Sequence, residues 1–386
     1  MILTNARVLF PDRIADGFEV VCRGSAITEV RSAQRANADA IDLRGNYLAP
    51  GFVDVHVHGA AGRDAMEASA EAFRAICHYH ASGGTTSLLL TTATAPIAQI
   101  VDVLRAAQAA QRHIPQLAGV HVEGPFISAA RAGAQRQESI RNPDAESIER
   151  LLEFSGVIKR MTLAPELPGA LELIIHLREQ QIAVSGGHSD AWDEEARAAF
   201  KQGMRHVTHT FNCMSSARKR EGQRVAGLLE FALSEPHVMC ELIADGHHVS
   251  STLMKMLYRA KGAEGICLVT DATAGAGLPD GATFTLAGVE CIVRDGACFL
   301  ASGSALAGSS ARMVDLVATM VREVGVPLHE AIAMATTNPA RGAGLPRKGR
   351  IEPGADADLV VLSPDLEALQ TFVGGERMFP RDAASS

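Results

Sequence analysis

The chain has 386 residues, of which 47% are hydrophobic, and a formal net charge of −8 at pH 7. A chain of this length can bury a large core, either as two or three average domains or as one barrel with an addition. The negative charge and the lack of a long run of Lys and Arg argue against a nucleic-acid-binding surface.

No segment of the sequence is typical of a membrane span or a signal peptide. No apolar run reaches the roughly 18 residues that a span needs, and Asn5 and Arg7 interrupt the apolar start of the chain. The seven cysteines are scattered, without a CxxC pair or the spacing of a disulfide framework. We therefore expect a cytoplasmic protein with reduced thiols that binds neither membrane nor nucleic acid.

Both ends of the chain have the composition of β-structure. Short strands broken by Pro, Asp-Gly and Gly are predicted in ILTNARVLF, FEVVCRGSAITEV and AIDLRGNYLAP, within the first fifty residues. Strand and turn chemistry returns near the end, in GRIEPGADADLVVLS. We expect the two ends to meet in one small β domain made of residues 1–49 and 346–386.

Helical segments alternate with short apolar runs through the middle of the chain. Helices are predicted over residues 69–82 and 95–111 and, later, over 314–324 and 328–336. The apolar runs are TTSLLLTT, AGVHVEGP, RMTLAPE, IAVSGGHS, HVTHTFN, HVMCELIADG and GICLVTDAT. This alternation predicts a parallel sheet or barrel over residues 50–345.

The stretch PGFVDVHVHG places two histidines, His56 and His58, at the end of a strand-like run. Strict alternation would put Val53, Val55 and Val57 on one face of the strand, and Phe52, Asp54 and both histidines on the other. The pair alone is as typical of two hydrogen-bonded histidines as of a metal site. Other residues must decide between these interpretations.

Most of the apolar runs end in a side chain that can bind a metal ion or transfer a proton. These residues are His56, His58, Glu123, His188, His209, His248 and Asp271. Strand ends converge on one mouth in a barrel, and imidazole and carboxylate groups are ligands for zinc and similar divalent ions. Asp271 is the candidate for the base that takes a proton from the attacking water and returns it to the leaving group.

The order of motifs carries a family resemblance over nearly the whole chain. HxHG, HVEGP, TLAPE, GHS, THTFN-x-M, ADGHHV, LVTDAT, LAGS and the closing G-x-I-x-P-G-x-DADLVVL follow one another. The chain resembles the N-acetylglucosamine-6-phosphate deacetylases of the amidohydrolase superfamily. The resemblance implies a (β/α)8 TIM-like barrel, an α/β fold, with a small β-sandwich built from both chain ends.

The resemblance also implies the reaction and the metal ligands. Glu123, His188 and His209 would be the principal ligands, and His56 and His58 would join Glu123 in a second site. The cofactor would be zinc or another divalent ion such as iron, as one or two ions. The enzyme would hydrolyse the N-acetyl amide of N-acetyl-D-glucosamine 6-phosphate, with Asp271 as the catalytic acid and base.

Ten residues match substrate-binding positions of the family. They are Ala134, Gln135, Asn212, Cys213, Arg220, Asp245, His248, Leu306, Ala307 and Gly308. Asn212 and Cys213 would hold the region of the substrate phosphate, and His248 would contact the sugar. Arg220 matches a phosphate-binding arginine that reaches the site of the neighbouring subunit, so the resemblance implies a homodimer.

Two positions depart from the family pattern. Gln135 stands where the family has a histidine that faces the substrate, and Cys213 stands where it usually has alanine. Glutamine still forms hydrogen bonds but cannot become cationic. The preferred sugar epimer, for example N-acetylgalactosamine 6-phosphate, and the acyl group therefore stay open.

Three other functions are weighed against this one. An amidohydrolase for cyclic amides would usually need a lysine carbamate between two metal ions, whereas the matching strand end here carries Glu123. A non-catalytic binding protein would be expected to lack some of the ligands or Asp271. A P-loop enzyme is not indicated, because no GxxxxGK[ST] occurs.

Overall fold

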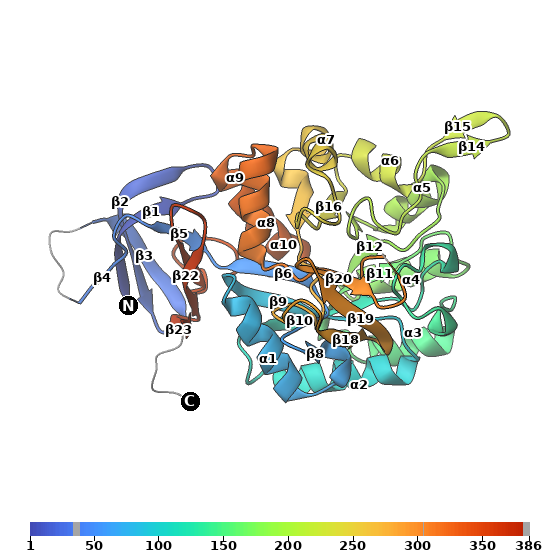
Figure 1. The fold of residues 1–386 in the computed structure, drawn as a ribbon, viewed down its shortest axis with the longest axis horizontal. Coiled ribbons are helices and arrows are strands. Elements are labelled where there is room, and N and C mark those ends of the chain that lie inside the picture. The colour runs from blue at the N-terminus through green and yellow to red at the C-terminus, as the bar shows by residue number, and fades with distance from the viewer. Residues whose placement is uncertain (34–38, 304, 381–386) are drawn as a thin grey trace.

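The computed structural model describes residues 1–33, 39–303 and 305–380. Its larger part is a parallel barrel sheet in which the order of the strands in space follows the order in the chain (Figure 1). The strands are β6 (Phe52–Val57), β9 (Thr85–Thr92), β10 (Leu117–Glu123), β11 (Ile158–Leu163), β12 (Ala183–Gly186), β13 (His206–Val207), β16 (Met239–Leu242) and β17 (Ile266–Leu268).

A helix follows each strand of the barrel and packs on its outside (Figure 1). These helices are α1 (Ala70–Ala81), α2 (Ile97–Ala110), α3 (Ala145–Leu152), α4 (Ala170–Glu179), α5 (Asp193–Gln202), α6 (Leu228–Ser234), α7 (Ser251–Lys261) and α8 (Met313–Thr319). The predicted (β/α)8 barrel is confirmed. The helices predicted from the sequence also lie within two residues of α1, α2, α8 with its continuation to Val324, and α9 (Leu328–Ala335).

The barrel is closed beside the first strand by the segment that follows β17. The Asp271 N–H donates to the carbonyl of His56 over 2.9 Å, and the His58 N–H donates to the carbonyl of Ala272 over 2.8 Å. Because these bonds join the two segments at the backbone, Asp271 is held next to both histidines.

The strand β6 carries a β-bulge that the strict alternation did not predict. Asp54 pairs with Leu88 and Val57 pairs with Leu90, so Val55 and His56 stand opposite a single residue of β9. Val53 and Val55 therefore pack in one cluster, whereas Val57 packs with Phe52 in the large core against the helices. The expectation that all three valines share a face was wrong, because the extra residue reverses the alternation.

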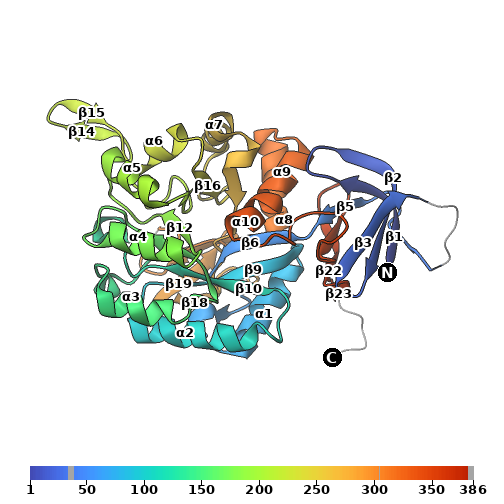
Figure 2. The ribbon, with the colours of Figure 1, turned by 180° about the vertical axis from the view of Figure 1, so that it is seen from behind.

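The two ends of the chain form one small sheet at one end of the molecule, where the N-terminus also lies (Figures 1 and 2). Its strands are β1 (Ile2–Leu9), β2 (Ile14–Arg23), β3 (Ala26–Ser32), β4 (Ile41–Asp42), β5 (Tyr47–Pro50), β21 (Leu359–Leu362), β22 (Ala368–Val373) and β23 (Glu376–Phe379). The strand β5 pairs with β21 and so joins the two ends. The domain boundaries at 49/50 and 345/346 stay a prediction.

The remaining elements are insertions and connections around the barrel. The hairpin β14 (Arg218–Arg220) and β15 (Gln223–Val225) projects from the end farthest from the small sheet (Figure 1). A three-stranded sheet of β18 (Thr283–Leu286), β19 (Val289–Arg294) and β20 (Ala297–Leu300) follows β17. The shorter pieces are β7 (Gly59–Ala60), β8 (Arg63–Asp64), α10 (Thr337–Gly342), four 3-10 turns (Ala65–Glu67, Ala129–Arg131, Gln137–Ser139 and Ala263–Gly265) and a π-helical turn, Met320–Val324.

Among the described residues, no helix is long and apolar enough to cross a membrane.

Candidate metal and substrate site

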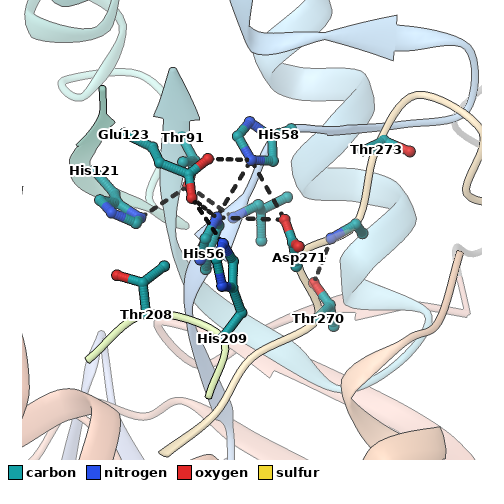
Figure 3. A network of polar contacts seen from close by, with 12 residues as sticks. His56, His58, Thr91, His121, Glu123, Thr208, His209, Thr270, Asp271 and Thr273 are labelled. Carbon is teal, nitrogen blue, oxygen red and sulfur yellow. Dashed lines mark hydrogen bonds and ion pairs between the residues drawn. The ribbon is translucent and has the colours of Figure 1, made fainter. Parts of the chain in front are cut away.

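Buried histidines and carboxylates gather at the carboxyl-terminal end of the barrel (Figure 3). His56 and Glu123 lie at the ends of β6 and β10, and the others follow β6, β12, β13 and β17 within three residues. They form two groups in which all potential ligand atoms lie within 4.8 Å of one another: Glu123, His188 and His209, and His56, His58 and Asp271.

The first group has the geometry of a three-ligand metal site. Oε1 of Glu123 lies 3.2 Å from Nε2 of His188 and 3.3 Å from Nε2 of His209. The two Nε2 atoms are 3.0 Å apart. A carboxylate and two imidazoles that point at one spot from three strand ends can hold a divalent ion and leave room for water.

The tautomers of the two rings support this interpretation. Nδ1 of His188 lies 2.8 Å from the carbonyl of Arg131, and Nδ1 of His209 lies 3.2 Å from the carbonyl of Asn212. A carbonyl only accepts, so each Nδ1 carries a proton and Nε2 of each ring is left to face the other. Two imidazole nitrogens at 3.0 Å need a proton or a metal ion between them, and with the carboxylate of Glu123 beside them the donor set fits a divalent metal.

The second group differs from the one expected from the sequence. Nε2 of His56 and of His58 lie 3.3 Å and 3.4 Å from Oδ1 of Asp271, and Nε2 of His58 lies 3.2 Å from Oε2 of Glu123. The Glu123 carboxylate thus faces both groups, as expected, and Asp271 completes the second one. Asp271 therefore offers a potential ligand atom to an ion in that group.

Opposite charges offset the cost of burial in this site. Burial lowers the pKa of His58, but its hydrogen bonds to Asp271 and Glu123 raise that pKa to about 9. Burial raises the pKa of Asp271, but the charge of His56 and the hydrogen bond of His58 lower it to about 2. Glu123 likewise has a pKa well below its usual range, because the charges of His56 and His188 outweigh the burial of the carboxyl.

Four side chains of the site stand on left-handed backbone. The φ angles are 46° at His188, 31° at His209, 48° at Cys213 and 49° at Asp271. Such angles are unfavourable for residues other than glycine, and they persist where the surrounding structure holds them for function.

No role was predicted for Glu241 and Arg160, which lie behind the candidate ligands. Oε2 of Glu241 lies 3.1 Å from Nδ1 of His56 and accepts from the backbone N–H of His209 over 3.2 Å. Arg160, which is fully buried, contacts the other oxygen of Glu241. The sequence contained a signal for both residues, because each is a charged residue within an apolar run.

A cavity of about 320 Å³ opens over both groups. Seven of the predicted substrate-binding residues line it: Ala134, Gln135, Asn212, Cys213, His248, Leu306 and Gly308. The sequence did not single out Ile243, Thr273, Leu286 and Ala305, which also line it. Leu286 belongs to the inserted sheet, so this insertion forms part of the cavity wall.

Three predicted substrate-binding residues are not among the described residues that line the cavity. The carboxylate of Asp245 lies 2.7 Å from Nδ1 of His248 and so orients that ring. Ala307 is fully buried in a hydrophobic cluster. Arg220 lies on β14, where it pairs with Glu194 over 2.6 Å and stacks on Trp192.

Gln135 holds a metal-ligand candidate. Its Nε2 donates to Oε2 of Glu123 over 2.7 Å, and its Oε1 accepts from the backbone N–H of Thr94 over 2.7 Å. The amide has one further N–H donor and lines the cavity. Glutamine in place of the family's histidine therefore contacts the ligand shell and retains a donor for a substrate.

Comparison with known proteins gives one consistent group of relatives. A model of the amidohydrolase family matches residues 47–378. The chain is 34% identical to an N-acetylglucosamine-6-phosphate deacetylase of Lysinibacillus sphaericus, over 97% of each chain. It is 37% identical to an N-acetylgalactosamine-6-phosphate deacetylase of Escherichia coli O157:H7, over 85% of this chain and 87% of that protein.

A solved structure is similar over almost the full length. It is a mutant N-acetyl-D-glucosamine-6-phosphate deacetylase of Mycobacterium smegmatis in complex with N-acetyl-D-glucosamine-6-phosphate. The TM-score is 0.92 at 31% identity, and the match covers 98% of this chain and 99% of the other.

The ligand role of the first group is open to a direct test. Replacing His188→Ala removes one of three donors, and we expect affinity for added Zn²⁺ at that group to fall by at least about 100-fold. Equilibrium dialysis against buffered Zn²⁺ measures this. The matched control is His237→Ala at an exposed histidine, which should bind Zn²⁺ as the unmodified protein does; equal binding by both variants would remove His188 from the ligand set.

Proposed function

Because the chain belongs to the amidohydrolase family and, within it, to the N-acetylglucosamine-6-phosphate deacetylases, we propose that it hydrolyses the acetamido group of N-acetyl-D-glucosamine 6-phosphate. The products are D-glucosamine 6-phosphate and acetate. The observation that carries the proposal is the convergence of Glu123, His188, His209 and Asp271 beneath one cavity, in a chain similar to such deacetylases over 97% of its length.

We propose zinc as the metal, held by Glu123, His188 and His209, with His56 and His58 beside Glu123 for a second ion. Nitrogen and oxygen ligands suit zinc, and the same set suits iron. A bound divalent metal would polarise the acetyl carbonyl and lower the pKa of water.

Asp271 is placed to transfer the proton that the reaction needs. Its pKa of about 2 keeps the carboxylate ionised at neutral pH, and the ionised form is the one that can accept a proton from the attacking water. Water forms the new bond to the acetyl carbon and the C–N bond breaks, and Asp271 returns the proton to the departing amine nitrogen. The carboxylate lines the cavity, in which the substrate would bind.

His248 is placed to stabilise the carbonyl oxygen. Burial lowers the pKa of His248, but the hydrogen bond and the charge of Asp245 raise it overall. In its protonated form the ring donates from Nδ1 to Asp245 and has Nε2–H left for the cavity. A positioned donor of this kind stabilises the negative charge that develops on the oxygen as water attacks.

A second candidate substrate follows from one of the relatives. The protein of Escherichia coli O157:H7 acts on N-acetylgalactosamine 6-phosphate, which differs from the first sugar in one stereocentre. Gln135 is part of the cavity wall and has a different donor pattern from the histidine of the family. The galactosamine epimer is therefore the alternative, and a different N-acyl amino sugar is a further one.

The structure gives less support to the other functions. No lysine is among the described residues of the cavity wall, as a carbamate bridge for cyclic amides would need. All of the ligand candidates and Asp271 are present and converge, whereas a non-catalytic binding protein has no need for them.

We also propose a homodimer in which Arg220 reaches the neighbouring site. The hairpin that carries Arg220 projects from the barrel (Figure 1), and its guanidinium lies outside the cavity of its own chain. A cytoplasmic location belongs to the same proposal, since all seven cysteines are unpaired, as in a reducing compartment.

Amine release from a panel of sugars tests the proposed substrate. We expect the protein supplied with zinc to release amine from N-acetylglucosamine 6-phosphate with a kcat/KM at least about tenfold above that for the galactosamine epimer or the unphosphorylated sugar. The reverse order of the two epimers would favour the second candidate. No turnover of any N-acetyl hexosamine phosphate would contradict the proposal.

Replacing Asp271→Asn should lower kcat by at least about 100-fold, because the amide cannot accept the proton of water. Metal content at Glu123, His188 and His209 should stay unchanged, which metal analysis of the same sample checks. Retained turnover with full metal would show that another group transfers the proton.

Replacing Arg220→Ala should raise KM for the phosphorylated substrate by about 10-fold to 100-fold and change kcat little, because a charged hydrogen bond to phosphate is lost. The neighbouring Lys219→Ala is the control. Light scattering should give a mass of about twice 40.8 kDa for the unmodified protein. A monomeric mass would rule out a contribution from a neighbouring subunit.

A further inference from the structure

A larger cavity, of about 600 Å³, lies at the opposite end of the barrel from the ligand groups. It is bounded by the positions where β13, β16 and β17 begin and by residues at the ends of α7 and α10. Because the strands are parallel, their first residues face away from the mouth that holds the proposed metal. The reaction proposed above makes no use of this cavity.

Most of the charged groups that line this cavity are cationic. Arg205, Lys261 and Arg341 contribute three permanent positive charges, His206 and His237 contribute imidazoles, and Glu264 is the carboxylate of the wall. The whole chain has a net charge of −8, so the positive charge of this concave surface is opposite in sign to the net charge of the chain. Clustered charge of one sign in a concavity raises the local concentration of the opposite ion.

Backbone carbonyls hold these cations without neutralising them. Arg205 donates to the carbonyls of Phe200 and Met204, and Lys261 donates to those of Ala232 and Glu235. Arg341 donates to the carbonyl of Glu264 over 3.0 Å. Within the described part of the chain, no carboxylate lies within 4.0 Å of any of the three. Each cation retains unused N–H donors as well as its charge.

The floor of the cavity adds a neutral donor. Nδ1 of the buried His206 accepts from Arg160 over 3.0 Å, so the proton of the neutral ring is on Nε2. No hydrogen bond among the described residues uses this Nε2. The charge of Arg160 is already neutralised by Glu241, which leaves the three cations at the rim as the free positive charges.

We propose that this cavity binds a small molecule that carries a phosphoryl group. Two guanidinium groups and an ammonium group are the donors that phosphate oxygens prefer, and the N–H of His206 lies among them. The volume of the cavity leaves room for an organic group beside the phosphate. The site is separate from the deacetylase centre and does not depend on the function proposed for it.

Equilibrium dialysis with labelled inorganic phosphate at constant ionic strength tests the proposal on the full-length protein. The test variant is Arg205→Gln with Arg341→Gln. The control is Arg74→Gln with Arg105→Gln, which removes two exposed arginines from α1 and α2 and makes the same change in net charge. Any phosphate bound at the metal end of the barrel is common to all three proteins, so only the difference between them reports on this cavity.

We expect the test variant to lose one phosphate site or to bind at that site at least about tenfold more weakly, since each cation contributes several-fold. The control should match the unmodified protein. Identical isotherms for the two variants would overturn the proposal, as would displacement of the bound phosphate by chloride at equal ionic strength. If the double variant does not fold, Arg341→Gln alone decides: weaker binding supports the site, and unchanged binding overturns it.

Discussion

The carboxylate of Glu123 is the contact on which the arrangement of the site depends. One oxygen lies within 3.5 Å of nitrogens from His56, His188 and His209, and the other faces His58 and Gln135. A buried carboxylate is costly unless it is paired and hydrogen-bonded. Here four imidazoles, which are potential metal ligands, and the amide of Gln135, which donates a hydrogen bond, satisfy it.

A second set of contacts keeps those neighbours in place. Glu241 orients His56 and the backbone of His209, and Arg160 neutralises Glu241 from the far side. Arg160 also forms a hydrogen bond with His206, at the floor of the cavity that we propose binds a phosphoryl group. Buried charges are tolerated only where each one has a partner. These paired charges extend from the end of the barrel with the candidate metal ligands to the opposite end, so both ends belong to one polar network.

The insertions between barrel elements give the common fold its particular site. The sheet after β17 supplies Leu286 to the cavity wall, and the hairpin after β13 carries Arg220 away from its own cavity. A barrel strand ends where its backbone pairing ends, and the loops beyond that point are free to differ in length and direction. Segments outside the barrel sheet therefore form part of the cavity wall, whereas the candidate metal ligands lie on the strands or just beyond their ends.

Period and composition, which are local properties, were sufficient to predict a parallel sheet or barrel, the joining of the two chain ends and the residues at the strand ends. The choice of a barrel came from the family resemblance of the motifs. It could not show the bulge at Val55 and His56, which depends on pairing with β9. It also could not show that Glu241 stands behind the ligands or that Gln135 binds Glu123, since these contacts join segments far apart in the chain. Only the tertiary structure decided which side chains meet, because a buried charge must find its partner in space rather than in sequence.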